Sequence, residues 1–134
     1  MFDEVCPKQV TDEETVKAAY QWVLDYLKYN EDYDTEYQYY DMNRILDCKS
    51  GICFDYSHLF AAICRSRNIP CYILDGYDRK NNNMLHTWNR VYFNGTWWNV
   101  DLSFDDRTDG RKYGFYKLDS FTEEDKDLVI TFIY

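Results

Sequence analysis

Three residues of this chain have types and spacing suited to nucleophilic catalysis: Cys53, His86 and Asp101. A cysteine thiol becomes a strong nucleophile when a neighbouring imidazole accepts its proton. A carboxylate on the other imidazole nitrogen fixes the tautomer and stabilises the imidazolium that then forms. If the fold brings the three side chains together, the predicted chemistry is acyl transfer. The sulfur would attack an amide or ester carbonyl, form a thioester, and pass the acyl group to water or an amine.

Cys53 lies where a helix is expected to begin. Apolar residues recur at helical spacing after it and would form one buried face: Tyr56, Leu59, Phe60, Ile63 and Cys64. The helix should end near Asn68, because Pro70 cannot continue it. At the N-terminus of a helix, unpaired N–H groups and the helix dipole stabilise an anion such as a thiolate. The Cys53 N–H would also hold the oxyanion of the intermediate, with a second donor expected from a Trp or Tyr among residues 22–40.

A β-hairpin is expected to carry the other two residues. Its turn is Asn94-Gly95, the strongest short hairpin signal, between predicted strands at residues 85–93 and 96–102. Side chains alternate between the two faces of a strand, so counting outward from the turn puts His86 and Asp101 on one face. They become diagonal neighbours, within reach of a hydrogen bond.

Each of these residues also has an ordinary structural interpretation. An isolated buried cysteine is usually a core residue, a strand histidine usually makes only a local hydrogen bond, and an aspartate at a strand end usually forms a turn. The joint placement of Cys53, His86 and Asp101 favours the catalytic interpretation. His58 is the only other histidine, and it is expected on the surface because it lies opposite the apolar stripe.

Cysteine usage argues against a metal site. The chain has five cysteines, at positions 6, 48, 53, 64 and 71, so any disulfide scheme leaves at least one unpaired. No CxxC pair occurs, which disfavours structural zinc, and the predicted acyl transfer calls for no cofactor and no metal. Cys64 lies on the apolar stripe of the predicted helix and Cys71 alternates with apolar neighbours in a predicted strand, so both are expected in the core.

The composition indicates one folded domain of 134 residues, with 46% hydrophobic and 19% aromatic residues. A net charge of −9 argues against nucleic acid or an anionic membrane as partner. No apolar run is long enough for membrane insertion, and no signal peptide follows Met1. The localisation therefore stays open: cytoplasmic if the chain is full length, extracellular or cell-surface if it is excised from a longer protein. The sequence does not indicate an oligomeric state.

The remaining elements follow from local patterns. Thr11 should cap a helix that runs to about residue 29, and residues 30–40 should form a tyrosine-rich loop that either lines a cleft or packs on itself. Further along, the sequence predicts a short helix at 42–47, a strand at 71–77, an exposed loop at 78–83, a surface loop at 103–114 and an edge strand at 128–134. Helices precede strands, which is typical of the α+β class.

Four segments together resemble one family: GICFDYS at 51–57, RSRNIP at 65–70, HTWNRVY at 86–92 and GTWWNVD at 95–101. They are similar to the core of the transglutaminase-like superfamily, and the resemblance covers about residues 14–105. It implies an α+β, papain-like fold with N-terminal helices and the nucleophile helix packed on an antiparallel sheet. It also implies that Cys53 is the nucleophile, His86 the general base and acid, and Asp101 the orienting carboxylate. Asn68 stands where the family often has glycine, and asparagine tolerates the left-handed conformation needed there.

The resemblance says less about the substrate. Members of the family include protein cross-linkers that join glutamine to lysine, amidases that remove glycans from asparagine, cysteine peptidases, and copies without known activity. This chain resembles the small microbial members, often one module of a longer surface or secreted protein. The leading hypothesis is a thiol acyltransferase or hydrolase acting on a peptide or side-chain amide of a protein or peptide substrate. The alternatives are a cysteine peptidase or deglycosylating amidase, and a non-catalytic protein-binding module that keeps the fold.

Overall fold

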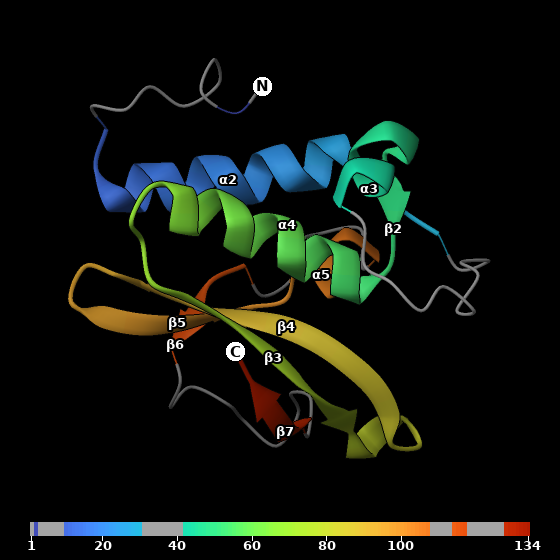
Figure 1. Cartoon of the computed structure of the whole chain (residues 1–134). Coiled ribbons are helices and arrows are strands. Elements are labelled where there is room, and N and C mark those ends of the chain that lie inside the picture. Colours follow the sequence, from blue (N-terminus) through green and yellow to red (C-terminus); the bar gives the residue numbers. More distant parts are fainter. Residues whose placement is uncertain (1, 3–9, 31–41, 108–113, 118–127) are drawn as a thin grey trace.

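The computed structural model describes residues 2, 10–30, 42–107, 114–117 and 128–134. Within these residues, helices α2 and α4 pack together above an antiparallel sheet that curves beneath them (Figure 1). This arrangement confirms the predicted α+β class with the nucleophile helix on an antiparallel sheet. Residues 31–40 of the predicted tyrosine-rich loop and residues 108–113 of the predicted loop at 103–114 lie outside the described residues.

Helix α2 spans Asp12–Tyr26 and begins as its sequence predicts. The Thr11 hydroxyl accepts the Glu14 N–H at 3.2 Å, which satisfies one of the donors left open at the helix start. The helix ends before residue 29, earlier than expected. There the chain extends, and strand β1, Lys28–Tyr29, pairs in parallel with strand β2, Ser50–Gly51. Pairing with a distant segment overrides the local helical pattern.

Helix α3 spans Met42–Cys48 and leads through β2 into α4, Cys53–Ser66. The predicted apolar stripe of α4 is buried and joins the core with residues of α2 and of the sheet. Beyond the end of α4, Asn68 has a φ of 59°, the left-handed conformation expected of asparagine at this position.

The main sheet has five strands in the order β6-β5-β4-β3-β7, and every neighbouring pair is antiparallel. The strands span Cys71–Asp78 (β3), Met84–Phe93 (β4), Thr96–Val100 (β5), Tyr116–Lys117 (β6) and Leu128–Ile133 (β7). A short 3-10 helix, Arg79–Asn81, lies within the predicted loop between β3 and β4. Strand β7 lies at the edge of the sheet beside β3, as predicted for residues 128–134.

The β4–β5 hairpin has the register that its turn predicts. Asn94 and Gly95 have φ values of 53° and 75°, which suits the tight turn that asparagine and glycine favour. Phe93 then pairs with Thr96, and the pairing continues without a shift until Asn89 meets Val100.

The structure corrects the sequence prediction after residue 100. Strand β5 ends at Val100 rather than at residue 102, and helix α5, Leu102–Arg107, replaces the start of the predicted surface loop. The cause is a cap at Asp101. Its Oδ1 accepts the Phe104 N–H at 3.3 Å and its backbone oxygen accepts the Asp105 N–H at 3.0 Å. A side-chain cap that satisfies the first N–H groups of a helix competes with strand pairing at this point.

Candidate active site

Cys53 is the first residue of α4 and is half-buried. A residue of the first turn caps the helix: Asp55 Oδ2 accepts the N–H of Ile52, the N-cap residue, at 2.9 Å. The folded-back carboxylate occupies the space beside Gly51, where a Cβ would lie 2.6 Å from both Asp55 Cβ and Oδ2. Only glycine therefore fits two positions before the cysteine without displacing the cap.

The segment before the cysteine is held by backbone pairing. Ser50–Gly51 forms β2 against β1, and the Asn30 N–H donates to the Gly51 carbonyl at 2.9 Å. The Lys28 N–H donates to the Lys49 carbonyl at the same distance. Only Ile52 separates this paired strand from the helix that Cys53 begins, so the backbone on both sides of the cysteine is held in place.

His86 lies on β4 with 11% of its side chain exposed. Its Nε2 is 2.5 Å from Asp101 Oδ2, so the predicted contact between imidazole and carboxylate is present. The ring stacks on that of Trp88, with centroids 5.9 Å apart and an angle of 16° between the planes. Trp88 is itself 2% exposed and limits the ring orientations open to the histidine.

Cys53 also lies close enough to this imidazole to affect its pKa. Burial alone would lower the pKa of His86. The charge and hydrogen bond of Asp101 and the contacts with Cys53 outweigh it and raise the pKa to about 9.

Asp101 is 1% exposed and uses both carboxylate oxygens. Oδ2 contacts His86, while Oδ1 accepts the Phe104 N–H at 3.3 Å and the Ser103 hydroxyl at 3.5 Å. Rotation of the carboxylate would break contacts on both sides. The fold thus brings together the three predicted residues, with Asp101 on a helix cap rather than within a strand.

Sequence reasoning missed α5 and the residues that hold it in place. Two of its carboxylates accept tyrosine hydroxyls: Asp105 from Tyr20 at 2.7 Å and Asp106 from Tyr56 at 2.6 Å. The available signal was Asp101 itself, since aspartate is a favoured N-cap residue. The tyrosine contacts are long-range and have no local signature.

His58 is half-buried rather than a surface residue as predicted. Its ring packs on Phe54, with centroids 3.8 Å apart, and lies 5.7 Å from the ring of Tyr134. Nδ1 donates to the Phe54 carbonyl at 2.8 Å, because a carbonyl can only accept. Burial lowers the pKa of His58, in contrast to His86. Tyr134, which directly follows strand β7 and is remote in sequence, supplies a contact that the helical pattern did not predict.

The other described cysteines have different surroundings. Cys64 and Cys71 are 0% and 4% exposed, which confirms their predicted place in the core. A hydrogen bond to Cys71, together with burial, raises the pKa of Cys64. Cys48 is exposed at the end of α3.

The described aromatic residues expected to supply a second oxyanion donor make other contacts. The Trp22 ring stacks on that of Tyr26 at 4.7 Å, and the Tyr26 hydroxyl donates to the Leu46 carbonyl at 2.5 Å. The Arg107 guanidinium lies 4.5 Å above the Tyr29 ring. The other predicted candidates fall among residues 31–40, outside the described part of the chain.

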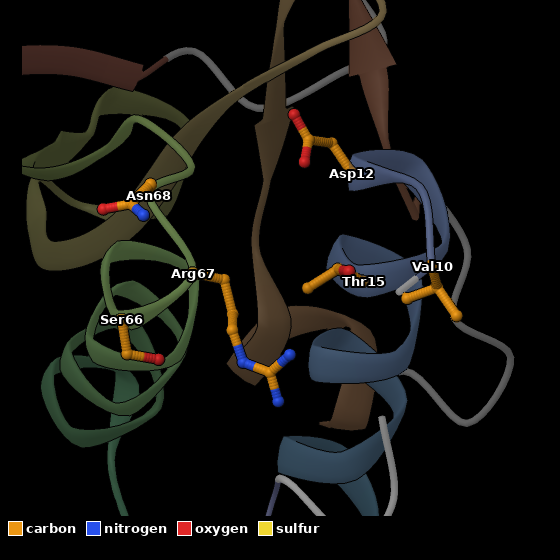
Figure 2. A pocket seen from close by; sticks show the side chains of 6 residues that line it. All are labelled: Val10, Asp12, Thr15, Ser66, Arg67 and Asn68. Atoms are coloured by element: carbon orange, nitrogen blue, oxygen red, sulfur yellow. The ribbon is translucent and has the colours of Figure 1, made fainter. Parts of the chain in front are cut away.

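A polar pocket of about 310 Å³ lies away from these residues, between the start of α2 and the end of α4. Figure 2 shows the Arg67 side chain extending between the two helices in this pocket. Its lining residues are Val10, Asp12, Thr15, Ser66, Arg67 and Asn68. Ser66 ends the helix that Cys53 begins, about 20 Å away at 1.5 Å per residue. The pocket is therefore separate from the Cys53–His86–Asp101 group.

Two features are absent from the described part of the chain. No set of three or more His, Cys, Asp or Glu side chains there is arranged to hold a metal ion. None of the helices in that part of the chain has the length and hydropathy needed to cross a membrane.

Comparisons with known proteins identify the family of this chain. The family model of the transglutaminase-like superfamily matches residues 3–102. Kyphoscoliosis peptidase is 28% identical in its human form and 26% in its mouse form over an alignment of length 105, which covers 70% of this chain. The chain spans only 16% of the length of these curated relatives.

Solved structures show the same fold at lower identity. The crystal structure of a TGase matches with a TM-score of 0.58 at 22% sequence identity. The match covers 72% of this chain and 27% of the TGase chain. A protein from Cytophaga hutchinsonii, provisionally described as a cysteine protease, has a TM-score of 0.51 at 18% identity. This match covers 98% of the present chain and 54% of the Cytophaga hutchinsonii chain. Because the family model matches well over half of the residues, this chain belongs to the transglutaminase-like superfamily.

Proposed function

We propose that this domain catalyses thiol-dependent acyl transfer or hydrolysis at a peptide or side-chain amide. Cys53 is the nucleophile, His86 the general base and acid, and Asp101 the orienting carboxylate. One observation carries the proposal: a single imidazole contacts both the half-buried thiol at a helix start and a buried carboxylate. Groups arranged in this order activate a thiol and hold the imidazole in the tautomer that the reaction needs.

The reaction begins from the ion pair that forms when the Cys53 thiol gives its proton to His86. The sulfur attacks the carbonyl carbon, a C–S bond forms, and the carbonyl oxygen becomes an oxyanion beside the positive end of α4. As the C–N bond breaks, His86 gives its proton to the leaving amine, and a thioester remains. Neutral His86 then takes a proton from water or from an acceptor amine. Attack on the thioester breaks the C–S bond and restores the ion pair.

The direct test measures ammonia release and amine incorporation on a panel of glutamine-containing peptides. Wild-type protein should turn over at least one peptide, and Cys53→Ala and His86→Ala should abolish that turnover. Cys48→Ala is the matched control, since Cys48 is exposed and lies outside the group, and it should keep the activity. Absence of turnover together with an unreactive Cys53 would contradict the proposal and favour a non-catalytic binding module.

A cysteine peptidase is the second candidate, because both curated relatives carry the name peptidase. It would use the same three residues and the same thioester, and differ only in the amide that is cut. A deglycosylating amidase differs in the same way. Cleavage of a peptide backbone, release of a glycan from a glycopeptide and release of ammonia from glutamine distinguish the three activities on one panel. The names of the relatives support a protein or peptide as substrate in each case.

A further inference from the structure

We propose that Tyr20 and Tyr56 are positioning residues that clamp helix α5 and thereby fix its capping carboxylate on the catalytic imidazole. This inference rests on the proposed function, because it assigns a role relative to that site. The clamp consists of two hydrogen bonds, Tyr20 to Asp105 and Tyr56 to Asp106.

Helix α5 needs external support. It has six residues, and helices this short are not stable on their own in water. Its first turn is closed by Asp101, whose other oxygen contacts His86. Any displacement of α5 therefore moves the carboxylate that orients the histidine.

The two tyrosines hold α5 from two different helices. Tyr20 lies on α2, and its hydroxyl donates to Asp105, which is 1% exposed, at 2.7 Å. Tyr56 lies on α4, is fully buried, and donates to Asp106 at 2.6 Å. Figure 1 shows α5 beside the end of α4 that follows β2.

Tyr56 also lies close to the nucleophile, because it follows Cys53 by one turn on the same helix. Its hydrogen bond links the helix of the nucleophile to the helix of the orienting carboxylate, so the two ends of the catalytic group share one rigid connection. Burial and the neighbouring carboxylate raise the pKa of Tyr56 well above its ordinary value. The hydroxyl therefore remains a donor across the whole pH range in which the site would work.

The test follows the imidazole and needs no substrate. The chain has two histidines, so NMR titration resolves His86 once His58→Gln has assigned the other signal. The wild-type His86 should titrate near pH 9. In Tyr56→Phe, α5 should be held less firmly and the contact between the Asp101 carboxylate and the imidazole should weaken. The midpoint of the His86 titration should therefore fall by about 0.5 to 1 pH unit. Tyr56→Phe leaves every charge in place, and therefore a shift reports position rather than lost charge.

Tyr26→Phe is the matched control. Its hydroxyl makes a hydrogen bond of similar length, to the Leu46 carbonyl, and does not touch α5. The control should titrate like wild type even where it loses the same stability in urea. Tyr20→Phe removes a hydrogen bond from the buried Asp105 carboxylate, so this variant is used only if its circular dichroism spectrum matches that of wild type. Asp106→Asn keeps an acceptor for the Tyr56 hydroxyl. Its His86 titration midpoint should therefore stay closer to the wild-type value than that of Asp106→Ala.

A folded Tyr56→Phe variant with a wild-type His86 titration would overturn the inference, whatever its stability. Where turnover is measurable, Tyr56→Phe should lower kcat about tenfold with little change in KM, because misplaced groups slow the chemical step. If wild type shows no turnover, the proposed function fails while the titration still decides whether the clamp exists.

Discussion

The Nε2 of His86 lies 2.5 Å from Oδ2 of Asp101, and this contact joins the sheet to the first turn of α5. One partner is a strand side chain and the other is a helix cap, so two elements decide the orientation of the imidazole. Burial would lower the pKa of His86, but the nearby carboxylate outweighs it and, with Cys53, raises the pKa to about 9. The protonated imidazole thus contributes to the stability of the fold as well as to the proposed chemistry.

Replacing His86 should flatten the pH dependence of stability in the neutral to alkaline range. The folded pKa of about 9 exceeds the ordinary value of 6.5. The contribution of the histidine is therefore fully present below pH 6.5 and is lost as the pH rises through 9. The shift corresponds to roughly 3 kcal/mol, shared with the Cys53 contact. Urea unfolding at about pH 6 and about pH 9.5 should show this loss in wild type and not in His86→Gln. Equal losses in both proteins would disprove the linkage.

Gly51→Ala should destabilise the fold and slow the reactions of Cys53. The added Cβ would lie 2.6 Å from the Asp55 carboxylate oxygen and would push aside the group that caps the nucleophile helix. We expect a loss of about 1–3 kcal/mol in urea unfolding. Ala62→Gly, at an exposed position of the same helix, should cost about 1 kcal/mol and leave Cys53 alkylation unchanged. If both variants lowered alkylation equally, the effect would be general instability rather than a displaced cap.

Much of the site could be predicted because its geometry is set by short-range rules. The Asn94-Gly95 turn fixes the hairpin register through two adjacent left-handed residues, and that register carries His86 to the face where it was expected. The apolar spacing of α4 and the proline after it define the helix that begins at Cys53. These features depend on residues that are close together in the sequence, so they can be predicted from the sequence alone.

The errors arise where distant segments decide the structure. Val100 and Leu102 are both buried and alternate like strand residues, yet the Asp101 cap and contacts from Tyr20 and Tyr56 turn the chain into α5. Likewise, Tyr134 covers His58 from the far end of the sequence. No window of ten or fifteen residues contains such contacts.

Gly76→Ala should loosen strand β7 from the sheet. A Cβ at this position would lie 2.0 Å from the Val129 carbonyl oxygen and 3.0 Å from the Trp88 ring. Since Trp88 stacks on His86, the substitution should disturb both the sheet edge and the imidazole. We expect faster amide hydrogen exchange in β7 and a stability loss of at least about 1–3 kcal/mol.

Gly95→Ala provides the comparison for this variant. An added Cβ meets nothing within 4 Å there, and only the left-handed φ of 75° is strained. Gly95→Ala should lower the free energy of unfolding by about 1 kcal/mol and leave amide hydrogen exchange in β7 unchanged. Protection of β7 that survives Gly76→Ala would show that the strand does not depend on this close approach.

Alkylation of the cysteines as a function of pH tests the ion pair most directly. An ordinary thiol is only roughly 0.3% thiolate at pH 6, so a cysteine paired with an imidazolium should react up to about 100-fold faster there. Mass spectrometry after brief iodoacetamide treatment should show Cys53 modified before the exposed Cys48. Buried Cys64 and Cys71 should react only after unfolding. His86→Ala should remove the advantage of Cys53, while His58→Gln, on the same helix as Cys53, should preserve it. If Cys53 and Cys48 reacted at equal rates at pH 6 in wild type, the thiolate–imidazolium pair would not exist in the resting protein, and a binding role for the fold would become the stronger hypothesis.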